Sequence, residues 1–221
     1  MEQVAQLFNN AEQGQAKLKK YTVSPEEASW ANLGLVRDGG WLYAVSPGEY
    51  IKLIINGQLY MSDTQMERRT NYEFMQEARG DVMIAGLGIG LIIYNLIPKI
   101  KDGTVKSITV YEKFQDVIDL VEPTIRQQLP DGFDFKVILG DILTYEPPKT
   151  EKYDTIYFDI WPEISSSNHK DMVLLHNRWK SHKHRGGWMD SWMKKKVYQL
   201  AKAEREYEGY GYMLGGHGAN W

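Results

Sequence analysis

The sequence predicts an α/β fold in which an open parallel sheet carries a small N-terminal β-hairpin extension. From residue 81 onward, short apolar strands alternate with helical segments, which is typical of a parallel sheet with right-handed crossovers and helices on both faces. Earlier in the chain, Asn56-Gly57 separates two apolar runs and predicts a two-residue hairpin. We therefore expect an N-terminal extension at residues 1–78 and an α/β domain at residues 79–221.

The composition is that of an ordinary globular protein. Of the 221 residues, 43% are apolar and 25% are charged, and the net charge is −3. Because the chain has no cysteine, disulfides, thiolate metal sites and cysteine-nucleophile mechanisms are excluded. The N-terminus lacks the basic and apolar regions of a signal peptide, so we expect a cytoplasmic protein. The longest uncharged run, residues 82–98, holds three glycines and Pro98, and it predicts a buried strand, a turn and a helix instead of a membrane span.

The extension is predicted to begin with helix and to continue as an antiparallel sheet. Ser24, Pro25 and Glu27 form the pattern of a helix N-cap followed by a capping box. Apolar runs on either side of the Asn56-Gly57 turn predict the two strands of the hairpin. The predicted elements are helix within residues 1–35, a strand at 41–45, strands at 50–55 and 58–61, and a helix at 64–78 that carries Tyr72.

The domain is predicted to contain five strands and four helices. Pro123 is expected to restart the second helix, and the Gly186-Gly187 turn is expected to precede the fifth strand. The predicted strands are 82–85, 107–111, 135–139, 153–158 and 188–192, and the helices are about 89–97, 114–129, 170–180 and 193–208. The glycine- and tyrosine-rich tail after residue 208 has no assignment.

Three glycines follow the first strand of the domain. In DVMIAGLGIGLIIY, Gly86, Gly88 and Gly90 stand between that strand and the next helix, where a tight turn lets a ligand touch the backbone. A dinucleotide fingerprint would require glycine at the position of Leu91. The G-x-G-x-G spacing therefore favours a nucleoside without a pyrophosphate. The alternative is a glycine turn that serves packing alone.

An acidic residue follows each of the next three strands: Glu112, Asp141 and Asp159. Ligands of an open parallel sheet bind beyond the carboxyl ends of its strands, beside the first strand. At those positions Glu112 can accept hydrogen bonds from both ribose hydroxyls, Asp141 can take an adenine amino group, and Asp159 faces the reacting atoms. Each acid taken singly is most simply a solvated loop carboxylate. The three in register behind the glycine loop indicate a nucleoside site.

These segments resemble the successive motifs of class I S-adenosylmethionine-dependent methyltransferases. The resemblance is carried by GLGIG, VYEKFQDVI, VILGDIL and YDTIYFDIWPE, covers roughly residues 41–163, and is closest to the spermidine synthase-like branch, the polyamine aminopropyltransferases. It implies a Rossmann-like sheet in the order 3-2-1-4-5, S-adenosylmethionine or its decarboxylated form as cofactor, a small-molecule acceptor and, as is common in that branch, a homodimer. It also implies that the three glycines, Glu112 and Asp141 hold the nucleoside, while Asp159 and Tyr72 face the acceptor amine.

The polyamine half of the resemblance is less complete than the nucleoside half. Spermidine synthases carry an aspartate where this chain has Ile89, and a D-x-x-D-P stretch where it reads Asp159-Ile160-Trp161-Pro162-Glu163. A diamine requires carboxylates spaced for two ammonium groups, and here only Asp159 and Glu163 are candidates. Trp161 and Pro162 would form an apolar wall. We therefore predict a methyltransferase for a small amine or hydroxyl acceptor, which Asp159 orients or deprotonates. The alternative is aminopropyl transfer to putrescine.

A basic stretch near the C-terminus gives a third hypothesis. Residues 176–196, HNRWKSHKHRGGWMDSWMKKK, hold seven Lys or Arg against one Asp, and cations interleaved with aromatics can neutralise phosphates and stack bases. This pattern would suit a non-catalytic nucleic-acid-binding module. The simpler interpretation, which we favour, puts Trp188 and Trp192 in the core of the fifth strand. His182 and His184 have no partners at metal-ligand spacing, so we expect no metal site.

Overall fold

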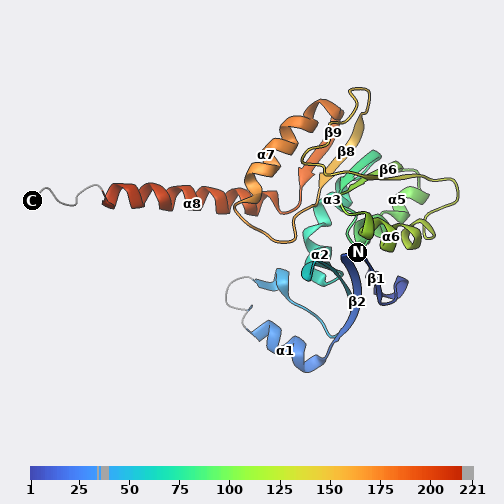
Figure 1. The fold of residues 1–221 in the computed structure, drawn as a ribbon, viewed down its shortest axis with the longest axis horizontal. Helices are drawn as coiled ribbons and strands as arrows, with labels where there is room; N and C mark the ends of the chain where they lie inside the picture. The colour runs from blue at the N-terminus through green and yellow to red at the C-terminus, as the bar shows by residue number, and fades with distance from the viewer. Residues whose placement is uncertain (34, 36–39, 216–221) are drawn as a thin grey trace, which may run out of the picture.

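The computed structural model describes residues 1–33, 35 and 40–215, which form two sheets (Figure 1). The N-terminal sheet is antiparallel and contains β1 (Ala11–Gln13), β2 (Ala16–Val23), β3 (Gly48–Ile55) and β4 (Gln58–Ser62), in that order. The second sheet is parallel and contains β5 (Gly80–Ala85), β6 (Val105–Glu112), β7 (Asp134–Leu139), β8 (Tyr153–Phe158) and β9 (Lys183–Ser191). Its order is β7-β6-β5-β8-β9, so the predicted fold class and the 3-2-1-4-5 order are confirmed.

The parallel register brings the strand ends that matter to one edge of the sheet. Ala85 at the end of β5 pairs with Tyr111 on β6 and with Phe158 on β8, and Tyr111 pairs in turn with Ile138 on β7. The loops that leave these four strands therefore begin side by side. The central strand β5 is buried over its last four residues, as expected for a strand covered on both faces.

Each face of the parallel sheet packs against a different set of helices. On one face, Val82 and Ile84 share an apolar cluster with α4 (Leu91–Asn95), α5 (Ile97–Lys101), α6 (Gln115–Arg126) and much of the N-terminal sheet. On the other face, Met83 and Ala85 pack with α7 (Asn168–Trp179) and the start of α8 (Lys194–Gly215). The period-two alternation along β5 thus divides the core into two layers. Short 3-10 helices occur at Ala5–Leu7 and Lys180–His182.

Two predictions for the domain were wrong, the helix restart at Pro123 and the turn at Gly186-Gly187 before the fifth strand. Pro123 does not restart a helix, because α6 continues through it and buries Val117, Val121 and Ile125 along one stripe. That apolar stripe anchors the helix on the sheet despite the hydrogen bond that a proline removes. Gly186-Gly187 does not precede the fifth strand but lies inside β9, opposite the register shift between Tyr153 and Thr155.

The helix predicted for residues 1–35 was mostly wrong. Only α1 (Pro25–Leu33) is helical in a regular way, whereas β1 and β2 form a hairpin and β2 pairs with β3 from Ala16 to Val23. Ala16 and Leu18 are buried on β2 while Lys17 and Lys19 are not, a period of two that the capping signals of the following helix overshadowed. The Asn56-Gly57 hairpin is confirmed, with φ of 51° and 78° at its two central residues.

The segment before the domain also differs in detail from the prediction. Residues 40–43 form a 3-10 helix where a strand at 41–45 was expected. The helix expected at 64–78 is broken at Asn71 into α2 (Gln65–Thr70) and α3 (Tyr72–Glu77). This break determines which side chains of the segment reach the edge of the parallel sheet.

The last helix extends away from the rest of the molecule (Figure 1). Val197 and Ala201 at the beginning of α8 are buried, whereas the helix is exposed from Lys202 to Tyr207. The predicted helix at 193–208 is thus confirmed and continues to Gly215, while residues 216–221 of the unassigned tail lie outside the described residues. Among the described helices, α8 included, none has the length and apolar character needed to cross a membrane.

Asp63 joins the N-terminal residues to the antiparallel sheet. Its side chain is fully buried and accepts hydrogen bonds from the backbone N–H groups of Val4, Ala5 and Ile51 at 3.1, 2.9 and 2.8 Å. Asp63→Ala leaves these three donors without their acceptor, so we expect a loss of about 3 kcal/mol in the free energy of unfolding. Urea denaturation checks this, with the exposed Asp131→Ala as control. A loss no larger than that of the control would contradict it.

Candidate functional site

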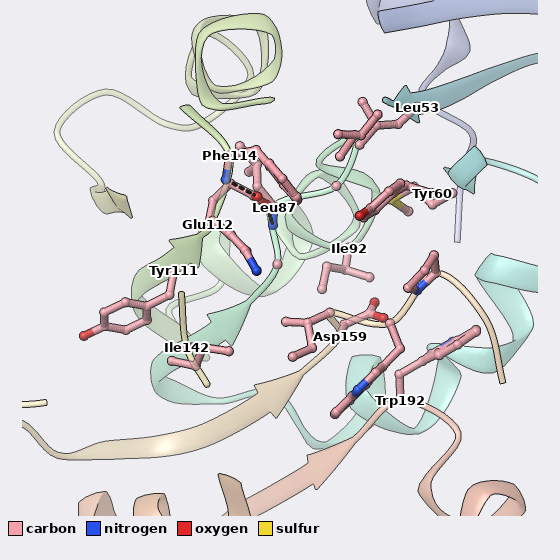
Figure 2. A pocket seen from close by; sticks show the side chains of 18 of the residues that line it. Leu53, Tyr60, Leu87, Ile92, Tyr111, Glu112, Phe114, Ile142, Asp159 and Trp192 are labelled. Carbon is pink, nitrogen blue, oxygen red and sulfur yellow. Dashed lines mark hydrogen bonds between the residues drawn. The ribbon is translucent and has the colours of Figure 1, made fainter. Parts of the chain in front are cut away.

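A cavity opens at the carboxyl edge of the parallel sheet, between that edge and the N-terminal sheet (Figure 2). The loops after β5, β6, β7 and β8 form one side of it, and Leu53, Tyr60 and Met61 of the N-terminal hairpin form another. In Figure 2, Glu112 and Phe114 lie toward one end of the cavity and Asp159 and Trp192 toward the other. Of the residues named from the sequence, the cavity is lined by Gly86, Gly88, Glu112, Asp141, Asp159, Trp161 and Pro162.

The glycine loop has backbone angles that side chains disfavour. Gly86, Gly88 and Gly90 have φ of 97°, 53° and 72°, all in the left-handed region. A Cβ at Gly86 would overlap the carbonyl oxygen of Asp159, and one at Gly90 would overlap Ile125 of α6. Gly90 therefore serves the packing of the loop on α6 and does not line the cavity, whereas Gly86 and Gly88 present backbone to it.

Gly86 is closely surrounded by other atoms whereas Gly103 is not, and this difference predicts how much an added Cβ destabilises the fold at each position. Gly86→Ala adds a Cβ that overlaps backbone, whereas Gly103→Ala, also at positive φ, adds a Cβ with no atom within 4 Å. We expect Gly103→Ala to cost about 1 kcal/mol from φ strain alone, and Gly86→Ala to cost at least about 2 kcal/mol more. Equal costs for the two variants in chemical denaturation would contradict the tight packing of the loop.

Glu112 ties the first two loops of the site together. Its side chain is 6% exposed, and its two oxygens accept hydrogen bonds from the N–H groups of Leu87 at 2.8 Å and Phe114 at 2.9 Å. Burial raises the pKa of Glu112, while these backbone donors act in the opposite direction. The backbone N–H groups of Lys113 and Gly88 also act to lower the pKa of Glu112, so donors from both loops converge on this one carboxylate.

Asp141 lies on the loop after β7 and pairs with the residue that follows Glu112. Lys113 Nζ lies 2.9 Å from Asp141 Oδ2, and the N–H of Leu143 donates to Oδ1 at 3.0 Å. Burial acts to raise the pKa of Asp141, but these two donors outweigh it and the pKa is lowered. Asp141 is therefore ionised at neutral pH and can accept a hydrogen bond.

Asp159 lies in a different electrostatic environment. Its backbone N–H continues the sheet by bonding to the carbonyl oxygen of Ala85 at 2.9 Å. Burial raises the pKa of its carboxyl group to about 7, although a hydrogen bond with Asn71 acts against the rise. Asn71 is itself fully buried and accepts a hydrogen bond from the hydroxyl of Tyr157 at 2.8 Å. An acid with a pKa near neutrality is well suited to take or give a proton.

Besides Gly90, two of the predicted site residues do not line the cavity, Tyr72 and Glu163. Tyr72 is 61% exposed and lines a separate surface hollow with Met75 and Tyr94, so the structure does not bring it to Asp159. Glu163 is exposed, and what it contributes is a backbone carbonyl that accepts a hydrogen bond from Asn168. Trp161, by contrast, is buried and lines the cavity beside Pro162.

Sequence reasoning missed several residues that the N-terminal segment brings to the cavity. Glu67 of α2 lines it and is only 9% exposed, and Asn71 lies four residues later, with its amide donating to the carbonyl oxygen of Glu67 at 3.0 Å. Tyr60 and Met61 cover the glycine loop, since the N–H of Ile89 donates to the Met61 sulfur at 3.3 Å. The sequence signal that could have identified Glu67 and Asn71 is their i, i+4 spacing, which places both side chains on one face of a helix.

The aromatic residues of the basic C-terminal stretch are part of the core. Trp179 is fully buried, and Trp192 is 3% exposed with its indole N–H donating to Thr70 at 2.9 Å. Trp188 packs against Phe74 and Tyr157. These side chains therefore lack the exposed ring faces on which bases stack.

Comparison with known proteins yields fold-level likeness alone. No family model and no curated protein matches the chain. It is similar to the solved structures of a S-adenosylmethionine-dependent methyltransferase from Clostridium acetobutylicum (20% identity, 57% of this chain and 46% of that one, TM-score 0.38) and of the glycopeptide N-methyltransferase MtfA (14%, 55% and 46%, 0.39). The chain thus spans less than half the length of these two proteins. At such identities and TM-scores the likeness is distant, identifies no acceptor and carries no argument about activity.

Proposed function

We propose that this chain is an S-adenosylmethionine-dependent transferase that transfers a methyl group to a small amine or hydroxyl acceptor. The observation that carries the proposal is the convergence of the loops after four strands, β5, β6, β7 and β8, on one cavity. These loops bring the glycine backbone, Glu112, Asp141 and Asp159 together. If these acids were only solvated loop carboxylates, they would not be expected to line a single, partly apolar cavity together.

The lining of the cavity fits a nucleoside. Glu112, buried at the end of β6 and lining the cavity, is positioned for ribose hydroxyls, and ionised Asp141 is suited to an exocyclic amino group. Leu87, Phe114 and Ile142 supply apolar surface near these two acids for a flat base. This is the side-chain chemistry that a purine nucleoside requires.

The other end of the cavity is suited to the acceptor. A sulfonium cosubstrate, when bound, supplies an already activated alkyl group, so the protein must align the acceptor and remove its proton. Asp159, with its pKa near 7, is placed to hold the acceptor and take that proton. The buried Trp161 and the half-buried Pro162 provide an apolar wall that excludes water.

The charge of the cavity favours aminopropyl transfer as a second candidate function. Among the described residues, four acids line it, Glu67, Glu112, Asp141 and Asp159, against one cation, Lys113, which is already paired with Asp141. The carboxylate of S-adenosylmethionine therefore has no free cationic partner in the described lining, whereas its decarboxylated form needs none.

Turnover assays separate the two functions. Methyl transfer predicts that the purified protein moves labelled methyl groups from S-adenosylmethionine to a panel of primary amines or alcohols. Aminopropyl transfer predicts turnover of decarboxylated S-adenosylmethionine with 1,4-diaminobutane instead. An absence of both activities in a protein that binds neither form would reject the proposed function.

A further inference from the structure

Four acids surround the buried ring of Tyr157, and they differ in how their charge is balanced. Glu73 and Asp190 lie outside the cavity, where Lys195 lies 3.2 Å from Glu73 and Lys194 pairs with Asp190. Glu67 and Asp159 line the cavity instead. Neither takes part in an ion pair among the described residues.

Among the described residues, Glu67 and Asp159 therefore have no cationic side chain that would balance them when they are ionised. Glu67 is nine-tenths buried, and its carboxylate accepts a hydrogen bond from the backbone N–H of Ser62, with no side-chain donor. Asp159 has the Asn71 amide as its side-chain partner. Two carboxyl groups in a desolvated site either share a proton or hold a cationic ligand, because an unpaired buried charge is costly.

We propose that Glu67 is the second carboxylate of the acceptor subsite, where Glu67 and Asp159 together bind the protonated amine end of the acceptor and Asp159 takes its proton. This inference rests on the proposed function and names its acceptor class as a primary alkylamine. In the step, an N–H bond of the ammonium group breaks, an O–H bond forms on Asp159, and the nitrogen keeps the electron pair. With that pair the nitrogen forms a bond to the activated carbon while the C–S bond breaks, and the sulfur keeps the C–S electron pair and leaves as a neutral thioether. The product leaves as a new ammonium ion, and Asp159 returns its proton to solvent.

The charge states of the two acids agree with this role. Burial first, and then the proximity of Asp159, raise the pKa of Glu67 to about 8, while the Ser62 N–H acts against the rise. Burial raises that of Asp159 to about 7. One member of the pair can therefore be ionised near neutral pH and accept a proton while the other donates a hydrogen bond. Among the described residues, Tyr157 is a further titratable group near both acids, and because burial raises its pKa well above the ordinary value, it stays neutral.

The principal test is a titration of nucleoside-saturated protein with amine probes. We expect 1,4-diaminobutane and butylamine to bind the wild type in the presence of S-adenosylhomocysteine, and 1-butanol not to bind. Glu67→Gln should weaken amine binding at least tenfold and leave S-adenosylhomocysteine affinity within about twofold. Glu73→Gln, which removes an acid that Lys195 already balances, is the matched control and should bind the amines like the wild type.

A second readout detects the carboxyl pair without any ligand. Because the folded-state pKa values of both acids lie above their unfolded values, the folded protein binds more protons between about pH 4.5 and 8, and stability falls as pH rises through that window. Glu67→Gln removes one of the two groups, so its Tm should fall less steeply than that of the wild type over this range.

The outcomes distinguish this inference from the proposed function. Protein that fails to bind S-adenosylhomocysteine, S-adenosylmethionine or the decarboxylated form overturns the proposed function. If the protein binds the nucleoside but neither amine at about 10 mM, roughly the weakest affinity that is worth measuring, the amine subsite alone is overturned. The same holds if Glu67→Gln binds amines as the wild type does, or if its pH dependence of Tm is unchanged.

Discussion

Replacing Asp159 with asparagine is expected to lower kcat/KM for transfer by at least about 100-fold, the usual contribution of a positioned proton acceptor. Asparagine has nearly the same size and can still bond to Asn71, so nucleoside affinity should stay within about threefold. Single-turnover rates and calorimetric titration of the same preparation measure the two effects separately.

Glu163→Gln is the control for this change, because Glu163 lies in the same loop but is exposed and does not line the cavity. It should leave both rate and affinity unchanged. If Asp159→Asn retained full activity, or if Glu163→Gln lost as much, the assignment of the acceptor end of the cavity would be wrong.

The second large effect is expected at Glu112, where Glu112→Gln should weaken nucleoside binding by about 10- to 100-fold. Hydrogen bonds to a charged acceptor contribute about 1.5–3 kcal/mol, and the glutamine amide can replace only one of the two oxygens that hold Leu87 and Phe114. We therefore also expect a lower Tm that bound nucleoside restores only in part. Calorimetry checks the affinity.

Glu146→Gln provides the matched control for Glu112, because Glu146 is an exposed acid on the loop that carries Asp141. Equal affinities for wild type and Glu112→Gln would show that Glu112 is a structural link between loops and not a ligand-binding group.

The side of the cavity formed by the strand ends could be predicted from the sequence because it depends on local order along the chain. Gly86, Glu112, Asp141 and Asp159 each follow a recognisable apolar strand, and parallel register alone aligns those strand ends at one edge. Their convergence required no knowledge of long-range packing beyond the sheet order.

The side of the cavity that the N-terminal segment forms could not be predicted in the same way. It depends on how the N-terminal sheet packs on the domain and on the break between α2 and α3, which turns Asn71 inward and leaves Tyr72 exposed. Neighbouring residues of a helix differ by about 100° in direction, so an error of one residue in helix phase moves a side chain from site to surface. Glu67 was missed for the same reason.

The early strands were missed because local and long-range signals conflict there. The capping box at Ser24 is real, with the Ser24 hydroxyl and the Glu27 carboxylate each accepting the other residue's backbone N–H at 3.1 and 2.7 Å. It starts a helix at that point but gives no information about residues before it. The strand character of β2 comes from its eight-residue pairing with β3, which is a tertiary contact.

The central claim is that the cavity binds the nucleoside of S-adenosylmethionine, and calorimetric titration of the wild-type protein tests it most directly. S-Adenosylmethionine and its decarboxylated form are titrated separately. The account predicts saturable one-to-one binding of at least one of them below millimolar concentration, with the preferred form identifying methyl or aminopropyl transfer. Absence of binding for both at millimolar concentration, in protein that melts cooperatively, would contradict the account.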